Sequence, residues 1–154
     1  MRDAIARLPA SKIREVANAG MGRSDVLAFW FGESDEVTPE AVRHAAAQSL
    51  QDGETFYAHN LGLPELRQAL ATYCSALHGN VDVGRIAVTS SGVNALMLAM
   101  QMLAGAGDEV VAVVPLWPNL TAQAAIMGAS VRRVALRPQH GRWMLDLDAL
   151  HEAV

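Results

Sequence analysis

The second half of the chain alternates short apolar runs with stretches of helix-forming residues, and this alternation restricts the fold more than any other feature. Runs rich in β-branched residues cover 85–89, 109–114 and 131–136. Helical patterns fill the two intervals, over 93–103 and 120–127. Strands joined by crossover helices lie parallel, and such a sheet carries helices on both faces. The pattern therefore predicts an α/β fold with a mostly parallel sheet.

The first half of the chain is predicted to be mainly helical. Three amphipathic segments open with a capping residue or a proline, and they cover 11–20, 38–50 and 64–77. Between the first two, the apolar run 25–31 predicts a strand. Two readings of the N-terminal residues remain open, an arm that packs on a neighbour and a helix of the same domain.

Composition limits the class of protein. Of the 154 residues 51% are hydrophobic and 18% are charged, which predicts apolar surface meant for a partner or for further chain. The net charge of −4 argues against a nucleic-acid or anionic-membrane surface, and the apolar run 110–117 is too short to span a bilayer. Cys74, the single cysteine, fits a reducing cytoplasm. The histidines show no metal-ligand spacing, so no metal site is expected.

Two turns at the ends of predicted strands are candidate ligand sites. They cover 90–94 and 115–119, and ligands of parallel sheets bind at the carboxyl ends of strands. At the first turn, Gly92 opens a helix whose first N–H groups have no partner inside the helix, so an anion such as a phosphate can approach. The turn matches neither a Walker loop nor G-x-G-x-x-G, and an ordinary strand-to-helix turn is the alternative.

Four segments of the chain carry a resemblance to a known family, and they are 31–39, 57–67, 91–96 and 115–119. In their order and in the distances between them, they resemble the N-terminal part of the class I/II aminotransferases, which are fold-type-I enzymes that depend on pyridoxal phosphate. The resemblance implies the three-layer α/β/α large domain of that fold. Residues 31–154 would be its truncated first part, and 1–30 an N-terminal arm or small-domain segment.

The resemblance also implies residue roles toward pyridoxal 5'-phosphate. Gly92, Val93 and Asn94 match the turn whose backbone N–H groups hold the cofactor phosphate. Trp117 matches the aromatic residue that stacks on the pyridine ring; filling the end of a strand is its alternative role. Tyr57 matches a tyrosine that reaches the phosphate in the neighbouring subunit of a homodimer with shared active sites; a buried loop tyrosine is the alternative.

On the substrate side, the resemblance assigns Gly32 to the neighbourhood of the substrate carboxylate, where a side chain would crowd the amino acid. A simple turn glycine is the alternative. His59 and Asn60 are expected to be structural or at the rim of the pocket. Ser34 and Glu36 depart from the proline and aromatic residue that the family often has here, which weakens any inference about the substrate side chain.

The family's Schiff-base lysine comes later than Val154, and Lys12, the only lysine, lies in the wrong segment to replace it. The chain is therefore expected to be an inactive fragment of a cytoplasmic aminotransferase, which moves an amino group between an amino acid and a 2-oxo acid. No catalytic residue is expected within it. A lyase that cleaves carbon–sulfur bonds on the same fold, and a non-catalytic module that binds phosphate or a partner protein, remain alternatives.

Overall fold

A computed structural model describes all residues from 1 to 154 as two compact units, one formed by 1–26 with 91–154 and the other by 27–90. The first unit contains α1 (Asp3–Ala6), α2 (Lys12–Gly20), α5 (Gly92–Leu103), β1 (Glu109–Val114), α6 (Pro118–Met127), β2 (Ser130–Ala135), β3 (Arg137–Gln139), β4 (Arg142–Met144) and α7 (Leu147–Ala153). The second contains α3 (Glu40–Gln51), α4 (Pro64–His78) and the 3-10 turn η1 (Val83–Arg85). No helix is both long and apolar enough to cross a membrane.

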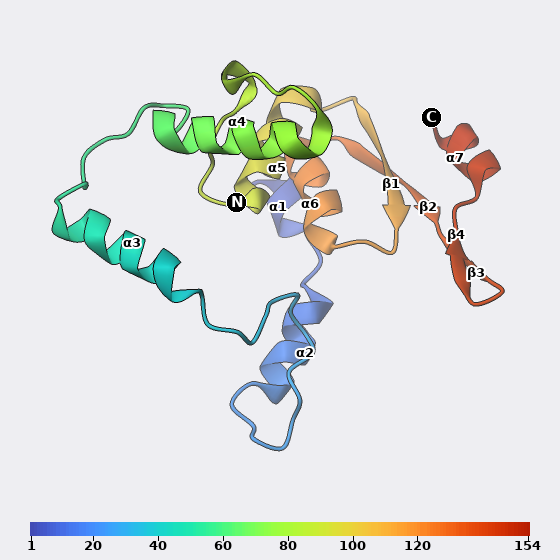
Figure 1. The fold of residues 1–154 in the computed structure, drawn as a ribbon. Helices are drawn as coiled ribbons and strands as arrows, with labels where there is room; N and C mark the ends of the chain where they lie inside the picture. Colours follow the sequence, from blue (N-terminus) through green and yellow to red (C-terminus); the bar gives the residue numbers. More distant parts are fainter. The chain divides into compact units, whose positions relative to one another are not determined.

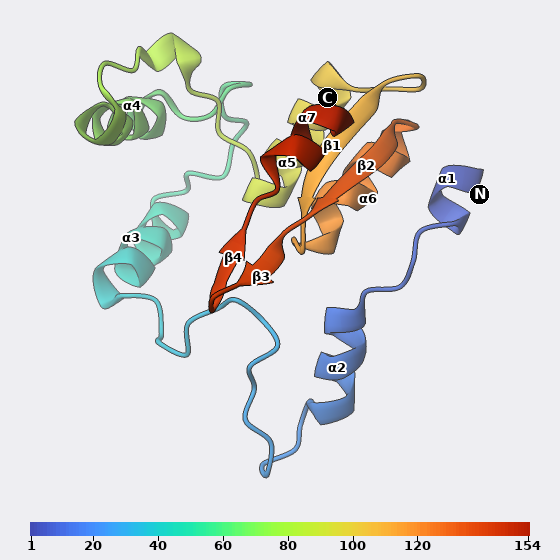
Figure 2. The same ribbon diagram turned by 90° about the vertical axis from the view of Figure 1, so that its right-hand side faces the viewer.

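The centre of the first unit is a parallel pair of strands. β1 and β2 run in register from Glu109 opposite Ser130 to Val114 opposite Ala135. α5 and α6 lie on one side of this pair and α7 lies on the other (Figures 1 and 2). α6 packs on both α5 and β2, while α7 packs on β2. The predicted α/β class with a parallel sheet is thus confirmed.

Local signals explain where α2, α5 and α6 begin and end. The Ser11 hydroxyl accepts the Arg14 N–H and caps α2, as the sequence predicted. α6 begins at Pro118, whose missing N–H would have no intrahelical partner at this position. It ends at Gly128, which takes φ +90° in the left-handed region. The side chain of Arg2 donates to the Ile126 carbonyl at 2.9 Å, which satisfies one of the last carbonyls of α6.

The antiparallel hairpin of β3 and β4 was not predicted. Its two turn residues, His140 and Gly141, have φ values of +49° and +75°. Two successive residues with positive φ are typical of the tight turn that matches the twist of paired strands. The sequence marks this hairpin only by Gly141. The strands on either side have three residues each and show no clear alternation of apolar and polar residues, so the pattern is weak.

In the second unit, side chains of α4, among them Ser75 and Arg67, bind the segment after the helix. Arg67 donates from Nε to the Ile86 carbonyl at 2.8 Å and from Nη2 to the Val83 carbonyl at 2.9 Å. α3 and α4 confirm the helices predicted at 38–50 and 64–77, although Pro39 rather than Thr38 precedes the first helical residue of α3.

Two predicted strands are wrong. The first is the strand predicted over 85–89. Its first residue belongs to η1, and residues 86–89 pair with no other strand. The Val88 N–H donates to the Leu61 carbonyl of a loop instead of to a neighbouring strand. The apolar run 25–31 forms turns and irregular chain, with Leu27 and Phe29 largely exposed. A strand needs a partner for its backbone groups, and β propensity alone does not supply one.

The buried apolar side chains are all small, and they are Ala17, Ala71, Ala124, Ala129 and Val134. Larger apolar side chains are exposed along α5, including Leu98, Met102 and Leu103. The apolar surface expected from the composition is therefore present on this helix.

Candidate functional site

The first turn of α5 presents two unpaired backbone donors. Ser91 precedes the helix in an extended conformation, and its hydroxyl accepts the Asn94 N–H at 3.2 Å. The Ser91 carbonyl accepts the Ala95 N–H at 3.0 Å. The N–H groups of Gly92 and Val93 have no acceptor within the chain. Three residues were predicted to hold a phosphate. Gly92 and Val93 therefore have a free backbone N–H, whereas the Asn94 N–H is already bonded to the Ser91 hydroxyl.

The electrostatics and the open space at this turn favour an anion. α5 has 12 residues, and no acidic side chain lies in its first turn. The partial positive charge at the helix N-terminus is therefore not neutralised by the helix itself, whereas α4 carries Glu65 in its first turn. A Cβ built on Gly92 would meet no heavy atom within 4 Å, so a ligand has room to approach the backbone.

Trp117 lies between the end of β1 and the first residue of α6. It is the N-cap residue of α6 and has an extended backbone. The residue is 42% exposed to solvent. The two residues after it, Pro118 and Asn119, line a hollow of about 660 Å³ together with Val93 and Asn94 of α5. The structure thus brings the first turns of α5 and α6 to one hollow, and of the two only the α6 turn follows a strand, β1.

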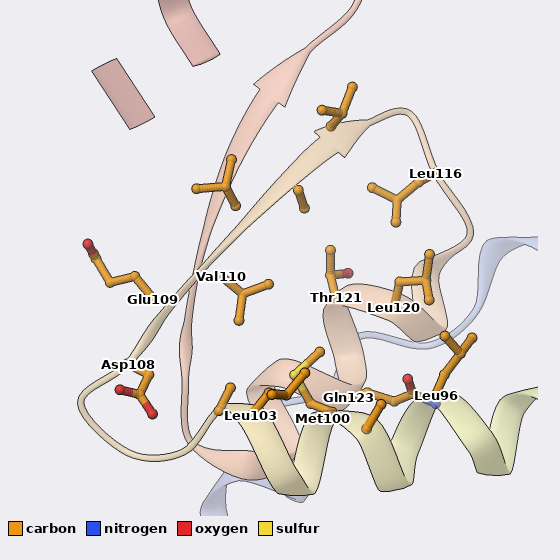
Figure 3. Close-up of a pocket in the computed structure, with 15 residues that line it drawn as sticks. Leu96, Met100, Leu103, Asp108, Glu109, Val110, Leu116, Leu120, Thr121 and Gln123 are labelled. Carbon is orange, nitrogen blue, oxygen red and sulfur yellow. The ribbon is translucent and has the colours of Figure 1, made fainter. Parts of the chain in front are cut away.

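A second hollow, of about 710 Å³, lies between α5 and β1 (Figure 3). It is lined mainly by apolar side chains, including Leu96, Met100 and Val110. Gln123 of α6 lines both hollows and is only 5% exposed. Its Nε2 donates to the Val93 carbonyl at 3.1 Å. No signal in the sequence marks this residue, because a glutamine in an amphipathic helix ordinarily lies on the solvent face.

Tyr57 and Gly32, the other two predicted site residues, belong to the second unit. The Tyr57 side chain is fully exposed, which contradicts the alternative of a buried loop tyrosine within this unit. A Cβ on Gly32 would meet nothing within 4 Å, so the space around it does not by itself require a glycine. In the same loop as Tyr57, the Nδ1 of His59 accepts the Leu61 N–H at 3.2 Å, which is a structural role.

Lys12 forms an ion pair on the exposed side of α2. Its Nζ lies 2.6 Å from a carboxylate oxygen of Glu15, three residues later in the helix. Both side chains are largely exposed to solvent. The site therefore offers backbone donors for an anion and, after β1, an aromatic ring, and no lysine is among the residues that line the hollow.

Curated relatives of this chain are aminotransferases. The aspartate aminotransferase of Pyrococcus horikoshii is 32% identical over 131 residues, which are 84% of this chain and 34% of the relative. The aspartate/prephenate aminotransferase of Thermus thermophilus is 36% identical over 118 residues, which are 76% of this chain and 31% of the relative. The chain thus spans about a third of the length of these relatives.

Solved structures give the same result. The aspartate aminotransferase of Thermotoga maritima matches with a TM-score of 0.89 at 28% identity, covering 100% of this chain and 42% of that one. The aspartate aminotransferase of Thermus thermophilus solved with maleate matches with a TM-score of 0.84 at 30% identity, covering 100% and 41%. The YbdL protein of Escherichia coli, for which a methionine aminotransferase function is described, matches with a TM-score of 0.87 at 25% identity, covering 100% of this chain and 40% of that one.

The family profile named aminotransferase class I and II matches residues 25–154. The matched region contains both turns of the candidate site, together with Gly32 and Tyr57. The chain therefore belongs to the class I and II aminotransferases.

Proposed function

We propose that the chain provides the phosphate and ring subsites of an aminotransferase that depends on pyridoxal 5'-phosphate and moves an amino group between an amino acid and a 2-oxo acid. One observation carries the proposal: α5 begins with two free N–H groups, and Val93, which supplies one of them, lines the same hollow as the first turn of α6, which follows Trp117. In the proposed assignment, residues 31–154 form the first part of the cofactor-binding large domain and residues 1–30 form an arm.

The residues at the α5 turn fit a phosphate. The donors of Gly92 and Val93 supply two hydrogen bonds, and the uncompensated helix end supplies a favourable field. Asn94, the third residue of the predicted turn, would bind the phosphate only if its N–H left the Ser91 hydroxyl. We therefore assign the stronger contacts to Gly92 and Val93. Charge-assisted hydrogen bonds of this kind contribute about 1.5–3 kcal/mol each.

Trp117 is proposed to hold the plane of the cofactor ring, because its indole is partly exposed beside the α6 turn. When bound, the cofactor supplies an electron sink for the pair left behind as the amino acid loses its α-proton. The exposed Tyr57 is proposed to donate from its hydroxyl to the phosphate in the neighbouring subunit of a homodimer. Gly32 is proposed to leave room for the substrate carboxylate.

The amine that moves the proton has no assignment within residues 1–154, since Lys12 is paired with Glu15 on α2. The amino donor also stays open. Matched proteins with aspartate and methionine aminotransferase names align over the whole of this chain, so this part of the fold accompanies different donors. Because Cys74 is the only cysteine within residues 1–154, the protein is proposed to be cytoplasmic.

The proposal is tested on the protein purified from its natural gene. Pyridoxal 5'-phosphate and a panel of amino acids, each with 2-oxoglutarate, are supplied, and the products are identified by mass. Transfer of a labelled amino group to the 2-oxo acid supports the proposal. Release of ammonia with pyruvate from a sulfur amino acid would support the lyase on the same fold. Cofactor binding with no turnover of any amino acid would support the non-catalytic module instead.

A further inference from the structure

Gln123 is a buried polar residue whose side chain is only half satisfied. It is 5% exposed, and the hollow between α5 and β1 that it lines also contains the apolar side chains of Leu96 and Leu120 (Figure 3). Its Nε2 has a partner in the Val93 carbonyl, but its Oε1 is buried and has none. A buried carbonyl without a donor is destabilising, whereas an apolar side chain of similar size would fill the same space without that cost.

The single hydrogen bond of the Gln123 side chain joins two distant parts of the chain. It connects α6 to the first turn of α5 across 30 residues of sequence. Val93 is the second residue of α5 and supplies one of the two free N–H groups. α6 begins directly after Trp117, its N-cap residue. The bond therefore links the element that carries the phosphate donors to the element that begins at the aromatic residue.

The same peptide unit also orders the cap of α5. Its carbonyl, on Val93, accepts from Gln123, and its N–H, on Asn94, donates to the Ser91 hydroxyl at 3.2 Å. Hydrogen bonds in such a chain polarise one another, so donation to the carbonyl strengthens the N–H as a donor. Gln123 thereby favours the arrangement in which Asn94 stays on the cap and the donors of Gly92 and Val93 remain available.

We propose that Gln123 is a positioning residue, which fixes the first turn of α5 relative to α6 and so sets the spacing between the phosphate donors and Trp117. This inference rests on the proposed function. The amide of Gln123 would act on the cofactor indirectly. It holds the turn that binds the phosphate, and it does not itself touch the bound compound.

The test replaces the amide without leaving a cavity. Gln123→Met keeps the length of the side chain, loses the donor to Val93 and removes the unpaired carbonyl. Gln123→Glu keeps the shape and, when ionised, also loses the donor. Gln101→Met is the matched control, because Gln101 lies on the exposed side of α5. Binding is measured by tryptophan fluorescence for two aldehyde-free probes, deoxypyridoxine phosphate and deoxypyridoxine, since neither can bond covalently to a lysine.

The expected result is a phosphate-selective loss. Both Gln123 variants should raise the dissociation constant of deoxypyridoxine phosphate by about two- to tenfold, the range of one neutral hydrogen bond, and leave that of deoxypyridoxine unchanged. The melting temperature of Gln123→Met should be equal to or above that of the natural protein, because its buried unpaired carbonyl is gone. Gln101→Met should change neither constant.

Three results would overturn the positioning role. Unchanged binding of both probes in the folded variants would show that the hydrogen bond does not set the site. An equal loss of both probes would show a general structural role, and so would the unfolding of both Gln123 variants. The proposed function fails separately, if the natural protein binds deoxypyridoxine phosphate no more tightly than deoxypyridoxine.

Discussion

Gly62 and Val88 lie so close together that a Cβ on Gly62 would be 2.7 Å from both the Cβ and the Cγ2 of Val88. Gly62 also has φ +104°, which side chains rarely adopt. The neighbouring Leu61 carbonyl accepts the Val88 N–H at 2.9 Å. This contact holds the loop that contains Tyr57 against the extended segment 86–89.

Gly62→Ala should therefore destabilise the protein by about 1–3 kcal/mol, since both the backbone conformation and the contact with Val88 oppose a side chain. Gly53→Ala is the matched control. Gly53 has φ +76°, but a Cβ there would meet nothing within 4 Å. The free energy of unfolding in urea should fall further for Gly62→Ala than for Gly53→Ala. Equal losses would show that the backbone angle alone matters and that the contact with Val88 does not.

Trp117→Ala should raise the dissociation constant of pyridoxal 5'-phosphate by about three- to tenfold, because stacking of aromatic rings contributes about 0.5–1.5 kcal/mol beyond burial. It should also slow transfer of the α-proton, since the ring is held less firmly. Trp143→Ala on β4 is the matched control, because Trp143 is 63% exposed and lies outside the proposed site. Stopped-flow absorbance gives both quantities. If the two variants bound the cofactor equally well, Trp117 would have no stacking role.

Tyr57→Phe should raise the dissociation constant of the cofactor by about tenfold, the effect expected for one hydrogen bond to a charged phosphate. It should hardly change stability, because the Tyr57 side chain is fully exposed. Tyr73→Phe on α4, which removes another largely exposed hydroxyl, should change neither. Cofactor titration followed by absorbance checks the affinity, and thermal unfolding checks the stability.

A mixed-dimer experiment tests whether Tyr57 acts across subunits. Two weakened variants, Tyr57→Phe and Gly92→Pro, are unfolded together and refolded as mixed dimers. If Tyr57 serves the neighbouring subunit's site, each mixed dimer contains one site with both changes and one site with neither, so tight cofactor binding returns to half of the sites. If Tyr57 serves its own subunit, every site keeps one change and tight binding does not return.

The parts of the fold that the sequence predicted well are those with local causes. α5 begins at Gly92, after the Ser91 cap, and α6 begins at Pro118, each within two residues of its predicted start, because a capping hydroxyl and a proline act on the next few residues only. The end of α6 at Gly128 has an equally local cause. The predicted strand at 85–89 failed because a strand depends on a distant partner, and the Val88 N–H found the Leu61 carbonyl instead.

The candidate site divides in the same way. The free N–H groups of Gly92 and Val93 could be expected from the sequence, because a glycine before a run of helix-forming residues marks the start of a helix, whose first N–H groups have no partner inside it. Gln123 could not be identified, because its burial depends on the packing of α6 against α5 and not on its neighbours in sequence. The pairing of Asn94 with the Ser91 hydroxyl likewise became evident only from the geometry.

The central claim is that the first N–H groups of α5 hold the cofactor phosphate, and Gly92→Pro tests it most directly. A proline suits the first position of a helix, and the preceding Ser91 has φ −167° and ψ 162°, which a following proline tolerates. The substitution removes the Gly92 N–H, and α5 should stay intact. The measurement is the ratio of the dissociation constants of deoxypyridoxine and deoxypyridoxine phosphate, in the natural protein and in the variant. The account predicts that this ratio falls about tenfold or more in Gly92→Pro, with unchanged helicity by circular dichroism. An equal ratio in the two folded proteins would contradict it.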